Sequence, residues 1–163
     1  MKWAGAALVA LLLAACAAPP VATPSAALAH AQVRSGRLAL SVQDRPGDSF
    51  SSAFELRGRP EAGQLTLLNP LGTVVAVLRW QPGSATLEAQ GRAPQQFDSL
   101  QAMVEQATGA PIPVAALFDW LDGTATPVAG WQVDLSSLAD GRLRAHRQAP
   151  PPEAGLRIVL DPS

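Results

Sequence analysis

Few residues of this 163-residue chain combine in a way that could support catalysis. The sequence has no tyrosine, one cysteine and two histidines, His30 and His146. A serine hydrolase needs a nucleophile, a base and an acid that orients the base, and the chain contains no Gly-x-Ser-x-Gly motif. His146 lies in an arginine-rich segment, where we expect it to face water. A hydrolase that uses His146 is therefore the weakest of three functional hypotheses.

Two carboxylates, Asp119 and Asp122, are the remaining candidates for acid–base chemistry. They are three residues apart in a predicted helix, and this spacing is more typical of a solvated helix face than of a catalytic pair. His30 has no second metal-ligating residue nearby, so we expect it on the surface or in packing. We predict no catalytic residue, no metal site and no enzymatic activity.

The single cysteine, Cys16, directly follows an apolar segment of thirteen residues, which itself follows Met1-Lys2. A membrane-spanning helix needs about 20 apolar residues, whereas this length is typical of a secretory signal peptide. The segment ends in Leu13-Ala14-Ala15-Cys16, which resembles the lipobox of bacterial lipoprotein precursors. The resemblance implies cleavage after Ala15 and a covalent diacylglycerol and N-acyl chain on Cys16. The alternative is an unmodified cysteine in an ordinary signal peptide.

The lipobox resemblance divides the chain into a signal peptide (1–15), a lipidated N-terminus with a flexible proline-rich tether (16–25) and one domain (26–163). Ala17 stands where enteric lipoproteins that stay in the inner membrane carry aspartate, so we expect an outer-membrane lipoprotein facing the periplasm. Apart from the acyl groups on Cys16, we predict no cofactor.

The charge balance excludes a basic nucleic-acid-binding domain. Beyond residue 15 the chain has 11 arginines against 13 acidic residues, hence a net charge of −2 and no cationic surplus to neutralise phosphates. Hydrophobic residues make up 48% of the chain and charged residues only 15%, which excludes general disorder.

Hydrophobic periodicity predicts a mainly β domain. Residues 26–34 can form a short helix, after which apolar and polar residues alternate in segments separated by turn residues. These predicted strands are residues 38–42, 50–57, 64–68, 73–80 and 85–90, and later 131–135, 141–147 and 156–160. Helical spacing appears at residues 100–107, with Asp98 or Ser99 as N-cap candidates, and at residues 113–121.

Large apolar residues occur both on the predicted strands and on the predicted helices. They could form an ordinary filled core, or they could line a cavity between a curved sheet and its helices. The sequence leaves both interpretations open. The candidate lining residues are Phe50, Phe54, Leu56, Leu65, Leu67, Trp80, Met103, Leu117 and Trp120.

A turn at Asn69-Pro70-Leu71-Gly72 places a large apolar residue among turn-forming residues. Turn tips are normally polar because they are exposed. Leu71 could fold back onto the sheet, or it could protrude and touch a membrane, with Asn69, Pro70 and Gly72 shaping the turn.

The order of these features resembles the LolB family of outer-membrane lipoprotein receptors. Two motifs carry the resemblance: the Leu67-to-Gly72 run, and residues 108–123, in which Gly-Ala-Pro-Ile-Pro precedes a helix with Trp-Leu-Asp-Gly at its end. The resemblance implies an α+β, mainly β fold: an unclosed antiparallel barrel with a helical lid over an apolar cavity. It also implies that Leu71 protrudes and serves membrane insertion.

In function, the resemblance implies a monomer that takes acylated lipoproteins from the periplasmic carrier LolA and inserts them into the inner leaflet of the outer membrane, in contact with its phospholipid. The alternative is a structural or envelope-assembly accessory lipoprotein with the same fold and no cargo. One departure concerns the fold: only eight residues lead from Gly123 to Trp131, too few for the further strand that the family commonly has there, so we expect a shorter barrel wall.

Overall fold

The computed structural model describes residues 31–162. The predicted signal peptide (1–15), Cys16, the tether (16–25) and His30 lie outside the described residues, so the predictions made for them are untested. Within the described part, no helix is both long enough and apolar enough to cross a membrane.

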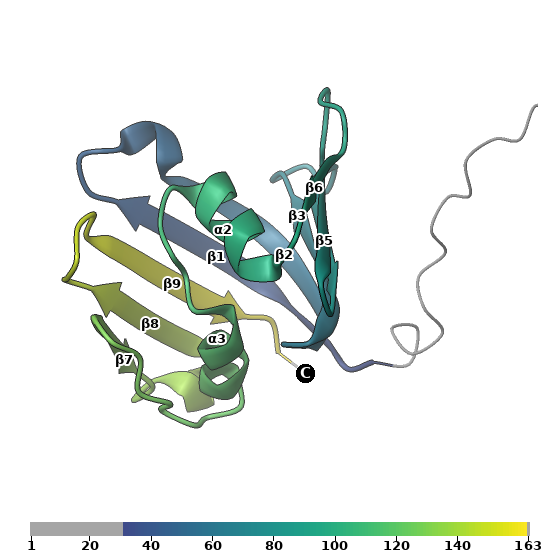
Figure 1. The fold of residues 1–163 in the computed structure, drawn as a ribbon. Helices are drawn as coiled ribbons and strands as arrows, with labels where there is room; N and C mark the ends of the chain where they lie inside the picture. The colour runs from purple at the N-terminus through teal and green to yellow at the C-terminus, as the bar shows by residue number, and fades with distance from the viewer. Residues whose placement is uncertain (1–30, 163) are drawn as a thin grey trace, which may run out of the picture.

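The described chain forms one nine-stranded antiparallel sheet with the order β6-β5-β4-β3-β2-β1-β9-β8-β7. Figure 1 shows that the sheet is strongly curved and that both helices lie on its concave side. The edge strands β6 and β7 pair only with β5 and β8 among the described strands, so the barrel is not closed. This confirms the predicted mainly β fold with a helical lid. The strands are β1 (Val33–Val42), β2 (Phe50–Arg59), β3 (Ala62–Leu68), β4 (Val74–Gln81), β5 (Ser84–Ala89), β6 (Gln95–Phe97), β7 (Trp131–Asp134), β8 (Arg142–Arg147) and β9 (Ala154–Leu160).

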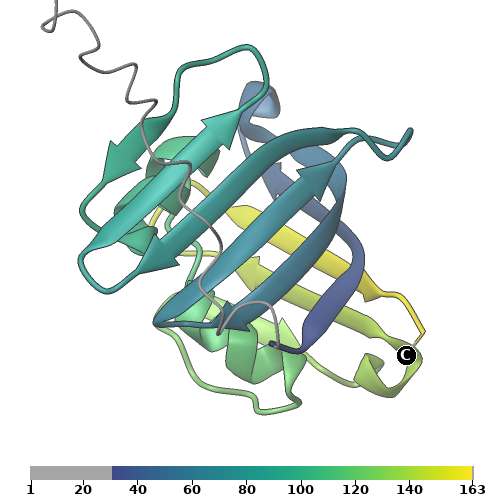
Figure 2. The same ribbon diagram turned by 90° about the vertical axis from the view of Figure 1, so that its right-hand side faces the viewer.

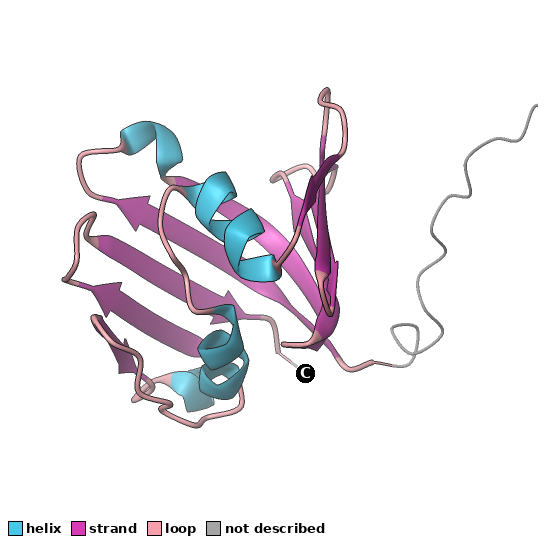
Figure 3. Ribbon diagram, in the orientation of Figure 1, coloured by secondary structure: helices cyan, strands magenta, loops and turns pink. Residues whose placement is uncertain are grey.

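Alternation along the strands separates a buried inner face from an exposed outer face. On β8, for example, Leu143 and Ala145 are buried, whereas Arg142, Arg144 and His146 are exposed. A sheet with one apolar face must cover that face, and here the helices do so. Figure 3 shows helices and strands in separate colours and makes this two-layer arrangement visible.

The lid consists of α2 (Leu100–Thr108) and α3 (Val114–Leu121). The Ser99 hydroxyl accepts a hydrogen bond from the Ala102 amide at 3.1 Å and so caps the first turn of α2. Gly109 ends α2 with a φ of 65°, a left-handed conformation that glycine adopts without steric cost. Two short 3-10 helices, η1 (Pro46–Asp48) and η2 (Leu138–Asp140), lie in connections between strands.

Two elements differ from the sequence-based prediction. Val33 and Arg34 were expected at the end of a helix, but they begin β1, where they pair with Arg57 and Leu56 of β2. Ladder pairing here overrides a weak helix propensity. The three-residue strand β6 was not predicted. Between α3 and β7 the chain makes only an isolated bridge, Val128 to Trp131, in agreement with the short spacing there.

Candidate functional site

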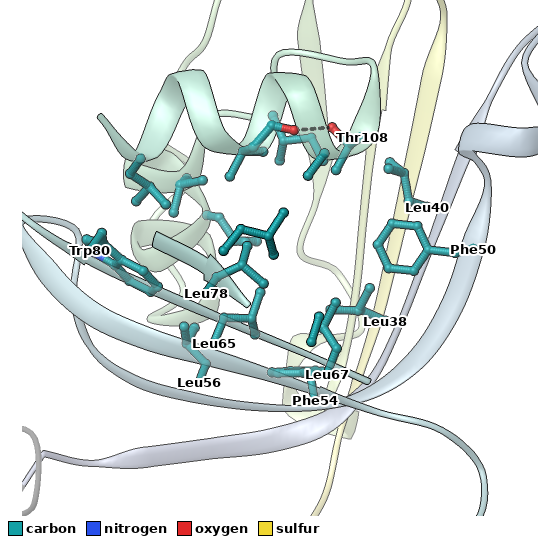
Figure 4. A pocket seen from close by; sticks show the side chains of 18 of the residues that line it. Leu38, Leu40, Phe50, Phe54, Leu56, Leu65, Leu67, Leu78, Trp80 and Thr108 are labelled. Atoms are coloured by element: carbon teal, nitrogen blue, oxygen red, sulfur yellow. Dashed lines mark hydrogen bonds between the residues drawn. The ribbon is translucent and has the colours of Figure 1, made fainter. Parts of the chain in front are cut away.

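An apolar cavity lies between the concave face of the sheet and the lid helices (Figure 4). Its volume of about 430 Å³ falls within the range of small-molecule sites, roughly 300–1,000 Å³. Nearly all of its lining side chains are apolar, and the polar ones are Arg92, Gln95, Gln106 and Thr108. The cavity is therefore suited to a ligand made mostly of hydrocarbon.

Most of the residues that the sequence suggested for the lining do line this cavity. β2 contributes Phe50, Phe54 and Leu56, β3 contributes Leu65 and Leu67, β4 contributes Trp80, and α3 contributes Leu117.

Met103 and Trp120 differ from the prediction, because neither belongs to the lining. They are 0% and 1% exposed and fill the core. Helical periodicity indicates which side of a helix is buried, but it cannot distinguish a side chain that borders a cavity from one that packs against another side chain.

Several further residues line the cavity that were not predicted from the sequence. On the strands, Leu38, Leu40, Ala76, Leu78 and Leu87 face the cavity, and each continues an alternation that had been recognised. These residues could therefore have been found in the sequence, because each is in step with the inward residues of its strand. Selection by side-chain size overlooks smaller inward residues such as Ala76.

The polar atoms in the deeper lining are satisfied by backbone groups. The Thr108 hydroxyl lies 2.7 Å from the Val104 carbonyl oxygen and 2.9 Å from that of Ala110. The Trp80 indole donates a hydrogen bond to the Arg59 carbonyl oxygen at 3.1 Å. An apolar ligand would therefore leave these buried groups paired, which avoids the cost of stranding them.

The cavity opens where its lining residues are exposed. These are Phe50 at the beginning of β2, Gln106 and Ala107 in the last turn of α2, and Arg92 after the end of β5. We call this opening the mouth. Phe50 is 37% exposed there, which is unusual for a phenylalanine in a sheet.

The turn from Asn69 to Thr73 joins β3 to β4 and carries Leu71 at its tip. Leu71 is 90% exposed, so it does not fold back onto the sheet. The Asn69 side-chain oxygen accepts hydrogen bonds from the amides of Leu71 and Thr73, both at 2.9 Å, and Gly72 has a φ of 80°. Pro70 follows Asn69 and is exposed. In Figure 2 this turn projects to the right, beyond the strands that it joins.

The mouth and the Leu71 turn lie at the same end of the sheet. The strand order β2-β3-β4-β5 is antiparallel, so the beginning of β2, the β3–β4 turn, the beginning of β4 and the end of β5 share one end. Of the five large apolar residues that are exposed in the described part, three are at this end: Phe50, Leu71 and Val74. Apolar surface is thus concentrated where the cavity opens.

The other candidates for chemistry lie away from the cavity lining. His146 is on the outer face of β8, where its Nε2 is 3.9 Å from an Oε2 of Glu153 and makes no hydrogen bond to a hydroxyl of the described residues. Asp119 and Asp122, expected to be simply solvated, each have a partner. The Thr126 hydroxyl donates to Asp119 at 2.7 Å, and Arg34 pairs with Asp122. Both carboxylates therefore have structural contacts.

Among the described residues, one titratable group has a clearly shifted pKa, and it lies on the outer face. Hydrogen bonds from the side chain and backbone of Ser136, with a smaller contribution from the charge of Arg144, lower the pKa of the exposed Asp134 carboxyl. Asp134 is at the end of β7 and does not line the apolar cavity.

Comparison with known proteins gives one consistent result. Residues 32–158 match the family described as Outer membrane lipoprotein LolB. Proteins named Outer-membrane lipoprotein LolB are similar along most of this chain. That of Bordetella petrii is 35% identical, over 97% of this chain and 88% of its own. That of Chromobacterium violaceum is 33% identical (82% and 72%), and that of Cupriavidus metallidurans is 30% identical (85% and 69%). The chain therefore belongs to the LolB family.

Proposed function

We propose that this protein is an outer-membrane lipoprotein that holds the acyl chains of other lipoproteins in its cavity. It receives them from the soluble carrier LolA and inserts them into the inner leaflet of the outer membrane. Cys16 carries the lipid that anchors the protein itself. Membership of the LolB family supports the role in lipoprotein localisation, and the shape and chemistry of the cavity support acyl binding.

One observation carries the proposal: the mouth of an apolar cavity and an exposed leucine lie at the same end of the molecule. A leucine in water gains about 1.5–3 kcal/mol when it enters an apolar environment. If Leu71 enters the bilayer, the mouth comes to the membrane surface, and the acyl chains need not cross open water.

The transfer needs no covalent step and no nucleotide. Each methylene moved from water into an apolar environment contributes about 0.8 kcal/mol, so an acyl chain avoids water at every stage and passes only from one apolar environment to the next. The direction of transfer then follows from affinity for the acyl chains, which increases from the carrier to the receptor and from the receptor to the bilayer.

The Leu71→Glu variant tests the membrane step. We expect it to fold normally, because Leu71 makes no buried contact, and to deliver lipoprotein into liposomes at least tenfold more slowly, because a carboxylate is costly to place in a bilayer. The matched control is Val159→Glu, which changes another exposed apolar residue, on β9, well away from the mouth. Normal delivery by Leu71→Glu would contradict the role of the turn.

A second experiment tests acceptance of cargo. LolA loaded with an acylated lipoprotein is mixed with this protein lacking its anchor, and the two are separated. The expected result is that cargo moves to this protein and displaces a neutral apolar probe from the cavity. Cargo that stays on LolA would contradict the proposal and leave a structural lipoprotein as the explanation of the fold.

A further inference from the structure

Arg92 is the only charged residue that residues 31–162 contribute to the cavity lining, and it stands at the mouth. It follows a tight turn after β5, in which Gly91 has a φ of 74° and the Arg92 amide donates to the Ala89 carbonyl oxygen at 3.1 Å. The Gln90 amide donates to the Val75 carbonyl oxygen at 2.9 Å. This bond joins the Arg92 turn to the beginning of β4, directly after the Leu71 turn.

The guanidinium of Arg92 is exposed and has no acidic partner. All 13 acidic residues of the chain lie within the described part, and none has a carboxylate oxygen within 4.0 Å of Arg92. On the neighbouring strands, by contrast, Arg57 pairs with Glu55 and Arg79 pairs with Glu88. The cation next to the mouth is thus free to bind an anion from outside the molecule.

Building on the proposed function, we propose that Arg92 binds the phosphate group of a membrane phospholipid while Leu71 enters the acyl layer. The acyl groups of the cargo are attached through ester, thioether and amide linkages, which carry no charge and offer no counter-ion for a guanidinium. Phosphate is the anion that every phospholipid surface presents, and arginine matches it with paired hydrogen bonds.

Two uncharged polar side chains, Gln95 and Gln106, line the same cavity as this cation. Gln106 of α2 donates to the Gln95 side-chain oxygen of β6 at 3.4 Å, a long bond that leaves both amides with spare donors. This end of the sheet thus carries three kinds of group: the apolar tip of the Leu71 turn, the cation at the mouth and neutral amides of the cavity lining. Two points of contact, Leu71 in the acyl layer and Arg92 at the phosphates, fix the orientation in which the cavity opens toward the leaflet.

The test uses the full anchored protein in two kinds of vesicle. One contains phosphatidylethanolamine and phosphatidylglycerol, and the other contains digalactosyl diacylglycerol, which forms bilayers without phosphate. The Arg92→Gln variant should slow delivery of bound lipoprotein about fivefold in phospholipid vesicles, as expected for one arginine near an anionic surface, and slow it clearly less in galactolipid vesicles. Arg157→Gln is the matched control, because Arg157 is also exposed, without an acidic partner, and lies on the outer face of β9.

A second measurement reads the contact directly. With ¹³C-labelled arginine, the dephasing of guanidinium carbons by lipid ³¹P should fall in Arg92→Gln and be retained in Arg157→Gln.

Three results would overturn the proposal: equal delivery by Arg92→Gln and wild type in phospholipid, equal slowing in both kinds of vesicle, or a defect confined to uptake from the carrier, which would identify an acidic protein surface as the partner. If wild-type protein itself delivers no cargo into either vesicle, it is the transfer function that fails. The ³¹P measurement then still decides the contact.

Discussion

Two regions on the concave side of the sheet have the same alternating pattern but different interiors. In the filled region, Leu143 and Ala145 of β8 are 1% and 4% exposed, and Trp120 packs against Trp131 with ring centroids 6.2 Å apart. In the hollow region, the inward side chains Leu65, Leu67, Ala76 and Leu87 of β3–β5 are only partly buried and face the cavity.

In both regions, inward apolar residues form the inner face of the sheet. Bulky side chains on the opposite layer decide whether the space behind that face is filled. The filled region has two tryptophans in contact. In the hollow region the wall is leucine and alanine, and Trp80 stands at one side of the cavity, edge to face with Phe118 at 6.3 Å. Native cores are close-packed, so a large void between well-ordered walls indicates a binding function rather than poor packing.

The largest effect on stability is expected when a large side chain of the filled region is replaced by alanine. Trp120→Ala should lower the free energy of unfolding by about 3–5 kcal/mol, because it opens a void where there is none. Leu65→Ala, in the hollow region, should lower it by only about 1–2 kcal/mol, because that side chain already borders open space. Urea denaturation measures both. Equal losses would show that the two regions do not differ in packing.

A substitution that adds a large side chain should again cost more stability in the filled region than in the hollow region. Ala76→Trp should fit into the cavity with little change in stability and weaken the binding of N-phenyl-1-naphthylamine about tenfold. The same change at Ala145, in the filled region, should cost about 1–3 kcal/mol through overpacking. Fluorescence titration and thermal unfolding give the two readouts. Unchanged probe binding by Ala76→Trp would place the probe outside the cavity.

The smallest effect on stability is expected for an ion pair that joins β1 to α3. Arg34 of β1 pairs with Asp122 at the end of α3, and the Asp122 side chain is 58% exposed, so the pair is screened by solvent. Arg34→Gln should reduce stability by about 0.5 kcal/mol, less at high salt, and leave probe binding intact. Arg59→Gln, whose pair with Glu61 is more exposed, should have less effect still. A large loss of probe binding in Arg34→Gln would mean that this pair holds the lid closed.

The sequence was informative wherever one local rule governed the structure. Period-two alternation located eight of the nine strands, and the cap at Ser99 and the glycine at 109 bounded α2. The turn residues around Leu71 located its loop. β6 was missed because three residues are too few to show a period, and Val33 and Arg34 joined β1 because of pairing with a distant strand.

The cavity could not be derived in the same way. Whether Met103 and Leu117 reach the cavity depends on how far each helix stands from the sheet, and no local pattern encodes that distance. Arg92 was overlooked for a related reason. Its significance arises from the turn that brings it to the mouth and from the absence of a carboxylate beside it, and both follow from the three-dimensional arrangement.

The hydrogen bonds of the Asn69 side chain have a kinetic consequence. Since they hold the backbone of Leu71 and Thr73 in position, the loop would lose little conformational entropy in the proposed membrane insertion. One leucine nevertheless contributes only about 1.5–3 kcal/mol, which corresponds to a weak and short-lived contact. In the proposed membrane step, a tip that is already ordered and weakly held would enter and leave the leaflet many times, and the same molecule would return for its next cargo.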